Sequence, residues 1–287
     1  MAITFKNLDF KTSKGLIPAI YCGNFENAKN IIIHLNIACG TKELIKFYNI
    51  PNFKHSTFIS IDLPGHGSCK IKPSRHPYYY VRIIHEIVDQ IKAKEANKKI
   101  IFFGESFGAN LASLYCKKYF SETNQYILLN PPFKIKNPKR TNEEKNTDNT
   151  FKLACKYVFT LLTNIDTYSI PHGIHNLTNN AVFLRMWKMR AQQNKQSTKI
   201  NLASWFSMSK ARKFILNHYE VDAMPHITLI TSKKDFYYQK NKNTIDKLTG
   251  YKLKNNSIEI FSEGDHFLMI DPTSQQEIWK IVLKHDK

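Results

Sequence analysis

The stretch that decides the fold lies at residues 99–113 and reads KIIFFGESFGANLAS. Its first half is an apolar run without polar alternation, which predicts a strand buried on both faces. Its second half has the composition of a helix. The segment Gly-Glu-Ser-Phe-Gly joins the two directly, so Ser106 stands at the tip of a sharp strand-to-helix turn. Gly104 and Gly108 are expected because a side chain there would collide with the flanking strand or helix.

A serine at the tip of such a turn predicts a nucleophile. The start of the helix offers backbone N–H groups and a positive dipole end to a developing oxyanion, with the N–H of Phe107 nearest. A hydroxyl is a weak nucleophile until a base removes its proton, so a His and a carboxylate that orients it are expected elsewhere. In this motif the acid follows the serine in the chain and the His comes last. The alternative is a tight junction in which the serine is incidental.

Apolar runs recur along the chain and alternate with segments of helical period. They predict strands at residues 31–35, 57–62, 99–104, 125–130, 226–231 and 257–261, and helices at 41–50, 78–96, 107–120 and 274–285. This alternation predicts an α/β fold with a mostly parallel central sheet flanked by helices. Residues 133–215 break it with a polar, loop-like stretch and then helical patterns. We therefore expect a core of residues 1–132 and 216–287 with a helical insertion at 133–215.

The base and the acid are sought in the second half of the chain. His266 is the leading candidate for the base, because it lies between the last strand and the last helix, where a loop can reach back over Ser106. Asp235 is the leading candidate for the acid, because it follows a strand end at the same sheet edge. Alternatively, His266 is a surface loop residue and Asp235 a helix cap. Less well placed candidates are His218 and His226 for the base and Asp222, Asp265 and Asp271 for the acid.

Three further segments, together with GESFG, resemble the α/β-hydrolase family, and specifically its capped esterase- and lysophospholipase-like branch. They are DLPGHGS at 62–68, SKKDFYY at 232–238 and EGDHFLMIDP at 263–272. The resemblance implies an α/β-hydrolase core, a helical lid formed by the insertion, and a Ser-Asp-His triad made of Ser106, Asp235 and His266. It implies no metal and no cofactor, and it gives His66 a structural role in its loop.

One segment departs from the family pattern. The family usually has His-Gly after the strand that supplies the second oxyanion donor, whereas this chain reads IIIHLNIACGT, with Leu35 in the place of the glycine. The second donor is then the N–H of Asn36, or of Leu35 if the register slips. A Cβ at that turn restricts the backbone. The departure keeps open a non-catalytic binding protein with the same fold, since a fold alone does not secure an activity.

The amino-acid composition, and the net charge above all, indicates which kinds of binding partner would suit this protein. The 287 residues are 42% apolar and carry a net charge of +19, and only six of the 42 basic residues are Arg. Residues 133–215 hold 15 basic and four acidic residues, which places +11 of this charge on the predicted lid. An acidic acyl carrier protein or an anionic membrane surface would suit such a lid, and a solvated Lys-rich surface is the plain alternative. Nucleic acid is disfavoured, because no basic platform with interleaved aromatic residues occurs.

Cysteine usage and apolar runs bear on location. Five cysteines without a CxxC pair predict neither a disulfide framework nor a zinc site. No apolar run reaches the length of a membrane span, so we expect a cytoplasmic protein.

The motif, the candidate triad and the family resemblance together predict a serine hydrolase that cleaves a carboxylic ester of an acyl chain. The family resemblance suggests an ester carried by an acyl carrier protein, like that of pimeloyl-ester esterases, with acyl thioesterase and lysophospholipase activities as alternatives.

Overall fold

A computed structural model describes most of the predicted core. The described residues are 3–38, 40–94, 97–119, 124–132, 227–235 and 257–286, with the isolated positions 178, 181, 183–185, 207, 210, 211 and 238. The expected helical lid at 133–215 lies almost entirely outside them.

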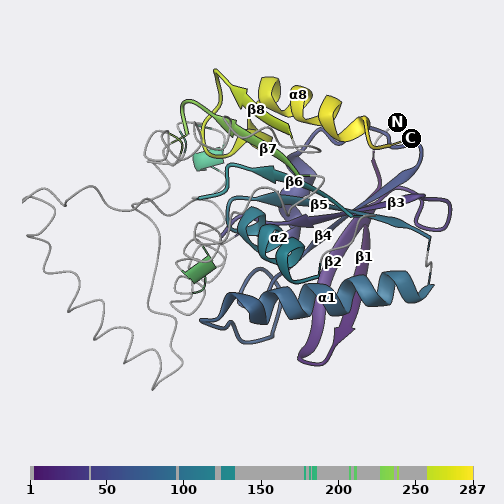
Figure 1. The fold of residues 1–287 in the computed structure, drawn as a ribbon. Helices are drawn as coiled ribbons and strands as arrows, with labels where there is room; N and C mark the ends of the chain where they lie inside the picture. Colours follow the sequence, from purple (N-terminus) through teal and green to yellow (C-terminus); the bar gives the residue numbers. More distant parts are fainter. Residues whose placement is uncertain are drawn as a thin grey trace, which may run out of the picture.

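In the described part of the chain, an eight-stranded sheet forms the centre of the fold (Figure 1). Its strands are β1 (Lys6–Thr12), β2 (Gly15–Cys22), β3 (Asn30–Leu35), β4 (Ser56–Ile61), β5 (Lys99–Glu105), β6 (Gln125–Leu129), β7 (Ile227–Ser232) and β8 (Ser257–Phe261). They lie in the order β1-β2-β4-β3-β5-β6-β7-β8. Strands β3 to β8 are mutually parallel, as expected, and coincide with the six predicted strands to within one residue at each end.

The edge hairpin of β1 and β2 was not predicted from the sequence. The two strands pair antiparallel with each other, and β2 pairs antiparallel with β4. β1 is largely exposed and carries charged side chains, so it lacks the apolar run that marks the inner strands. Pro18 lies in β2 where that strand pairs with β1 alone, which fits the restriction of proline to positions outside a fully paired ladder.

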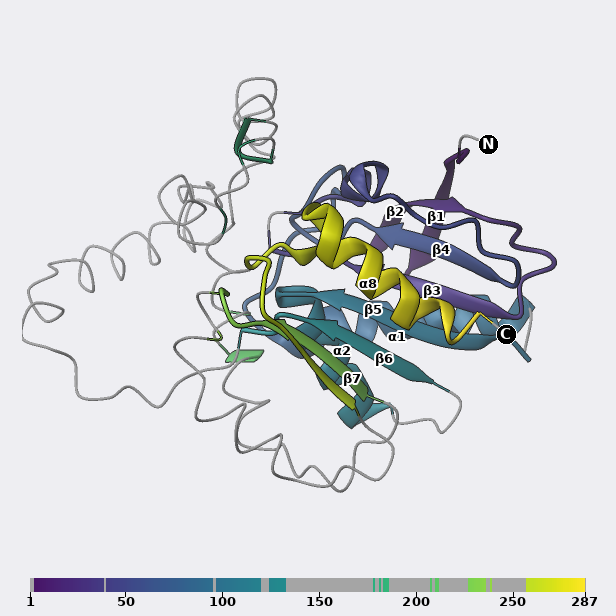
Figure 2. The ribbon, with the colours of Figure 1, turned by 90° about the horizontal axis from the view of Figure 1, so that it is seen from above.

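Helices cover both faces of the sheet (Figures 1 and 2). α1 (Pro77–Lys94) and α2 (Phe107–Lys118) lie on one face, and α8 (Pro272–Leu283) lies on the other. Phe102 of β5 packs its ring against Tyr115 of α2, whereas the next residue, Phe103, stacks on Trp279 of α8. Consecutive side chains of β5 are therefore buried on opposite faces, which explains why the inner strands are apolar throughout.

Two shorter helices complete the described elements. The predicted helix at 41–50 is a 3-10 helix, η1 (Lys42–Phe47), shortened because Pro51 disfavours a helical conformation just before it. A second 3-10 helix, η4 (Leu268–Ile270), leads into α8. None of the helices in the described part of the chain has the length and apolarity that a membrane span needs.

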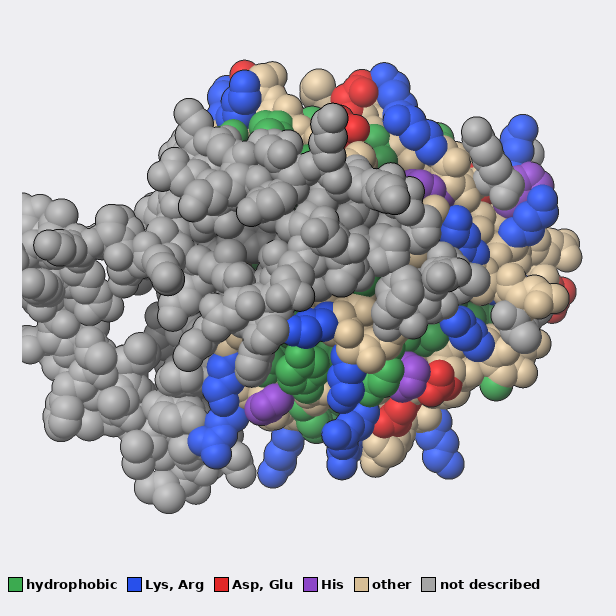
Figure 3. All heavy atoms as spheres, viewed as in Figure 1, with side chains coloured by type: hydrophobic (Ala, Val, Ile, Leu, Met, Phe, Trp, Pro, Cys, Tyr) green, Lys and Arg blue, Asp and Glu red, His purple; other side chains and the backbone are tan. Residues whose placement is uncertain are grey.

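The described residues also show how the basic side chains and the thiols are distributed. On the face shown in Figure 3, the Lys and Arg side chains of the described residues are spread along the upper, right and lower margins rather than gathered in one cluster. Three described cysteines are free thiols. Burial raises the pKa of Cys22 to about 12 and the pKa of Cys116 to about 11, so both stay protonated at neutral pH. Cys39 and Cys155 lie outside the described residues.

Candidate active site

Ser106 occupies the turn between β5 and α2 in an unusual backbone conformation. Its φ is 51° and its ψ is −111°, a region that residues other than glycine rarely adopt. Its N–H donates to the carbonyl of Leu129 at the end of β6 (2.8 Å), and its carbonyl accepts from the N–H of Asn110 in α2 (3.2 Å). These bonds hold the strained turn in place.

The two glycines of the turn are required by close contacts. A Cβ at Gly104 would lie 2.7 Å from backbone atoms of Ala109, at the start of α2, as predicted. A Cβ at Gly108 would lie 1.9 Å from the carbonyl oxygen of Leu35. The partner of Gly108 is thus the end of β3 and the residue after it, and not the strand or helix beside the turn.

Three predicted residues meet at this turn. Nε2 of His266 lies 2.8 Å from Oγ of Ser106, and Nδ1 of His266 lies 2.9 Å from Oδ1 of Asp235. The side chains of His266 and Asp235 are almost fully buried. Asp235 follows β7 and His266 follows β8, so three strand ends at one sheet edge supply the group. A hydroxyl, an imidazole and a carboxylate in this order can pass a proton from the hydroxyl to the ring while the carboxylate stabilises the resulting charge.

The described alternatives have other partners. Asp271 caps α8 by accepting a bond from the N–H of Ser274 (2.7 Å). Asp265 accepts from the N–H of Phe267 (2.9 Å) and from the hydroxyl of Thr178. His218, His226 and Asp222 lie outside the described residues. Within the described part of the chain, no three His, Cys, Asp or Glu side chains gather as they would around a metal ion.

Asn130 is a supporting residue that the sequence analysis missed. It follows β6 with a φ of 42°, and its amide nitrogen donates to the carbonyls of Asp265 and His266 (3.1 Å each). Its amide oxygen accepts from the N–H of Ser232 at the end of β7 (3.2 Å). One buried side chain therefore joins the ends of β6 and β7 to the His266 loop. The available signal was an Asn directly after a buried strand, since Asn tolerates a positive φ and carries both a donor and an acceptor.

Two backbone N–H groups next to the Ser106 turn are the candidate oxyanion donors. Phe107 is the first residue of α2, and Asn36 directly follows β3 and adjoins Gly108. Among the hydrogen bonds of the described residues, none is donated by the N–H of Phe107 or of Asn36. Leu35, in contrast, is the last residue of β3 and pairs with strands on both sides. This geometry favours Asn36 over Leu35 as the second donor.

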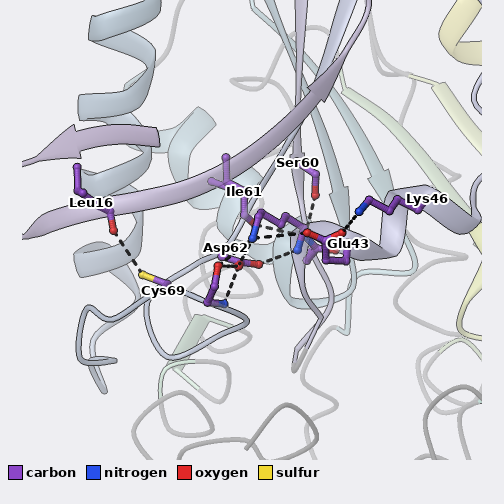
Figure 4. Close-up of polar contacts among 10 residues, drawn as sticks. Leu16, Glu43, Lys46, Ser60, Ile61, Asp62 and Cys69 are labelled. Atoms are coloured by element: carbon purple, nitrogen blue, oxygen red, sulfur yellow. Dashed lines mark hydrogen bonds and ion pairs between the residues drawn. The ribbon is translucent and has the colours of Figure 1, made fainter. Parts of the chain in front are cut away.

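The DLPGHGS segment forms a loop that is held by hydrogen bonds to Asp62 (Figure 4). The carboxylate of Asp62 accepts from the N–H of Lys42 (2.6 Å) and from the N–H and hydroxyl of Ser68 (2.7 and 2.8 Å). His66 is buried, and its ring stacks on the ring of Phe107 with the centroids 6.3 Å apart. Burial lowers the pKa of His66, which favours a neutral ring. These contacts fit a structural role for His66.

Most of the chain matches a known protein family. A model of the family described as serine aminopeptidase, S33, matches residues 53–273, which is well over half of the chain. The chain belongs to this family. It is thus a member of a serine hydrolase family with the α/β-hydrolase fold. No curated protein sequence matches this S33 α/β-hydrolase.

Solved structures share the fold along the whole chain. A carboxyl esterase from Bacillus coagulans, in complex with glycerol, is 13% identical over 99% of this chain and 98% of its own, with a TM-score of 0.65. A monoacylglycerol lipase from Paleococcus ferrophilus is 16% identical over 100% and 98%, with a TM-score of 0.63. A thioesterase domain from the curacin biosynthetic pathway is 16% identical over 99% and 100%, with a TM-score of 0.66. At these identities the similarity shows the fold alone.

Proposed function

We propose that this S33 α/β-hydrolase cleaves a carboxylic ester of an acyl chain through an acyl-enzyme on Ser106. The observation that carries the proposal is the continuous hydrogen-bonded path from Ser106 through His266 to Asp235, with 2.8 and 2.9 Å between the paired atoms. The shared fold of a carboxyl esterase, a monoacylglycerol lipase and a thioesterase domain supports acyl transfer as the reaction class.

The reaction follows from the positions of these atoms. Nε2 of His266 takes the proton of Ser106 as Oγ attacks the ester carbonyl carbon, and the oxyanion faces the N–H groups of Phe107 and Asn36. His266 then gives the proton to the leaving alcohol, and the acyl-enzyme forms. A water molecule deprotonated by His266 attacks the acyl-enzyme, which releases the acid and returns the proton to Ser106. Asp235 holds the proton of the ring on Nδ1 throughout.

Ester turnover tests this function. The wild-type chain should hydrolyse p-nitrophenyl esters of short and medium acyl chains, and Ser106→Ala should lower kcat by about 10⁴-fold or more. Ser113→Ala, at a buried serine further along α2, is the control and should retain activity. An inactive wild type with a folded core would favour the alternative, a non-catalytic binding protein with this fold.

The charge of residues 133–215 supports a more specific class of substrate. The predicted lid would carry a charge of +11, which would attract an acyl group presented by an acidic carrier protein, and this steering would raise the association rate more than the affinity. An acyl ester on an acyl carrier protein is our proposed substrate, with a carrier thioester or a lysophospholipid in an anionic membrane as alternatives. The cysteine pattern supports a cytoplasmic location.

Carrier dependence can be measured directly. One acyl ester should be turned over faster when attached to an acyl carrier protein than when free, and the advantage should shrink as salt rises. Equal rates that do not depend on salt would contradict steering by a carrier. A preference for lysophospholipid in anionic vesicles, lost in neutral vesicles, would favour the membrane alternative instead.

A further inference from the structure

Five polar side chains are buried together beneath the Ser106 turn. They are Asn36, Ser60, His34, Glu105 and Tyr48, and each residue is at most 5% exposed. We call this group the buried polar chain. Two of its members adjoin the proposed active site, since Glu105 directly precedes Ser106 and Asn36 carries the proposed second oxyanion donor. The triad chemistry itself uses none of the five side chains.

The contacts of the buried polar chain are continuous. The amide nitrogen of Asn36 lies 3.1 Å from Oγ of Ser60 and 3.3 Å from the carbonyl oxygen of Ile61. Figure 4 shows Ser60 and Ile61 in succession at the end of β4. Oγ of Ser60 lies 2.9 Å from Nδ1 of His34, and Nε2 of His34 lies 2.7 Å from Oε1 of Glu105.

Tyr48 closes the other end of the chain, where its hydroxyl donates to the same oxygen of Glu105 (2.6 Å). Burial, reinforced by the charge of Glu105, raises the pKa of Tyr48 well above its ordinary value, so the phenol keeps its proton. Oε1 of Glu105 therefore has two close partners, the hydroxyl of Tyr48 and Nε2 of His34.

One direction of donation gives every donor of the chain an acceptor, whereas Oδ1 of Asn36 has no partner among the described residues. A backbone carbonyl can only accept, so the Asn36 amide presents its N–H₂ to Ile61 and Ser60. Ser60 accepts from Asn36 and donates its own proton to Nδ1 of His34. His34 is then neutral, with its proton on Nε2, and donates to Glu105. The rings of Phe58 and Phe103 pack around His34, with their centroids 5.6 and 5.7 Å from the centroid of its ring.

We propose that the buried polar chain is a positioning device that holds the Asn36 N–H in place to receive the oxyanion. The proposal rests on the proposed function. Glu105 is the last residue of β5, so the chain ties the backbone just before the nucleophile to the turn after β3. The contact of Gly108 with the carbonyl of Leu35 sets the distance between the same two segments from the other side. A donor that is fixed before the reaction stabilises the transition state without reorganisation.

Ser60 is the link whose removal tests the device. Ser60→Ala breaks the connection between His34 and Asn36 and removes only one oxygen atom. We expect kcat for a p-nitrophenyl ester to fall about tenfold with KM nearly unchanged, because a displaced donor loses transition-state stabilisation. The inhibition constant of a trifluoromethyl ketone, which forms a tetrahedral adduct with an oxyanion, should rise by a similar factor.

A matched control separates positioning from packing. Thr57→Val, on the same strand, also removes a buried hydroxyl, and within the described residues Oγ1 of Thr57 has no hydrogen-bond partner. It should leave kcat and the inhibition constant unchanged. Wild-type kcat in Ser60→Ala, or equal losses in both variants, would overturn the proposal.

Histidine NMR tests the chain without turnover. In protein labelled with ¹⁵N-histidine, the resonances lost in His34→Gln should report a neutral ring protonated on Nε2 in the wild type. A ring protonated on Nδ1, or on both nitrogens, would contradict the direction of donation. An inactive wild type that shows the expected ring would count against the proposed function and not against the buried polar chain.

Discussion

Gly108 permits a close contact between the start of α2 and the turn after β3, because it has no side chain. Its Cα packs so closely on the turn after β3 that a Cβ would lie 1.9 Å from the carbonyl oxygen of Leu35. The sequence motif predicts a small residue here, but it does not reveal the partner, because Leu35 belongs to a distant segment. The same contact brings Asn36 beside the start of α2.

Gly108→Ala should therefore damage both stability and activity. The new methyl group must push the turn after β3 away, at a cost of about 1–3 kcal/mol in the free energy of unfolding. Displacement of the Asn36 N–H should lower kcat by about 10²-fold. Urea unfolding and ester turnover measure the two effects, with Ser113→Ala as the control in the same helix. A Gly108→Ala variant with wild-type stability and kcat would contradict the close contact.

Local sequence indicated the three candidate triad residues, which meet in the structure, better than it indicated the residues that hold them in place. Ser106 could be found from its motif, and Asp235 and His266 could be found because each follows a recognisable strand at the same sheet edge. Asn130 and Ser60 could not be found, because their roles depend on side chains that meet only after distant strands have paired. The hydrogen-bond partner of a buried polar residue can be identified from the folded structure, but not from the residues next to it in the sequence.

At the scale of elements, the ends of the parallel strands form the site. β5, β6, β7 and β8 all end at one edge, and Asn130 joins the end of β7 to the His266 loop. The inner strands could be predicted because a strand covered on both faces is apolar throughout. The hairpin of β1 and β2 could not, because its exposed, charged residues and Pro18 resemble a loop.

Asn130→Asp tests the link between these strand ends. The aspartate keeps the shape of the side chain but loses the two donors, and its charge would face the carbonyls of Asp265 and His266. We expect a loss of about 1–3 kcal/mol in the free energy of unfolding and a fall in kcat of about tenfold, because His266 is no longer held. Asn124→Asp, just before β6 at the other end of that strand, is the control for kcat. A normal kcat in Asn130→Asp would remove this residue from the support of the base.

At the scale of the whole molecule, the excess of positive charge is uneven along the chain. Residues 133–215 supply +11 of the net +19, whereas the basic side chains of the described residues are dispersed on the face that Figure 3 shows. A dispersed basic surface is what a Lys-rich composition produces by itself. The proposal of an acidic carrier therefore depends on the predicted lid and not on the described core.

Alkaline pH should destabilise the folded chain through its buried thiols. The pKa of Cys116 is raised from 9.0 to about 11 by burial, so between these values the unfolded chain loses a proton that the folded chain keeps. The free energy of unfolding should therefore fall as pH rises from about 8 to about 10.5, by on the order of 1–2 kcal/mol for such a thiol. Urea unfolding at both pH values measures this, and Cys116→Ala should show a smaller fall. An equal fall in both proteins would exclude a contribution from this thiol.

Covalent labelling of Ser106 tests the central claim most directly. A fluorophosphonate reacts readily with a serine whose hydroxyl is activated by a neighbouring base, so the wild-type protein should gain the mass of one adduct, and peptide mapping should place it on Ser106. His266→Ala should label far more slowly, and Ser106→Ala should not label at all. Labelling that persists in Ser106→Ala, or a folded wild type that does not react, would contradict the assignment of Ser106 as an activated nucleophile.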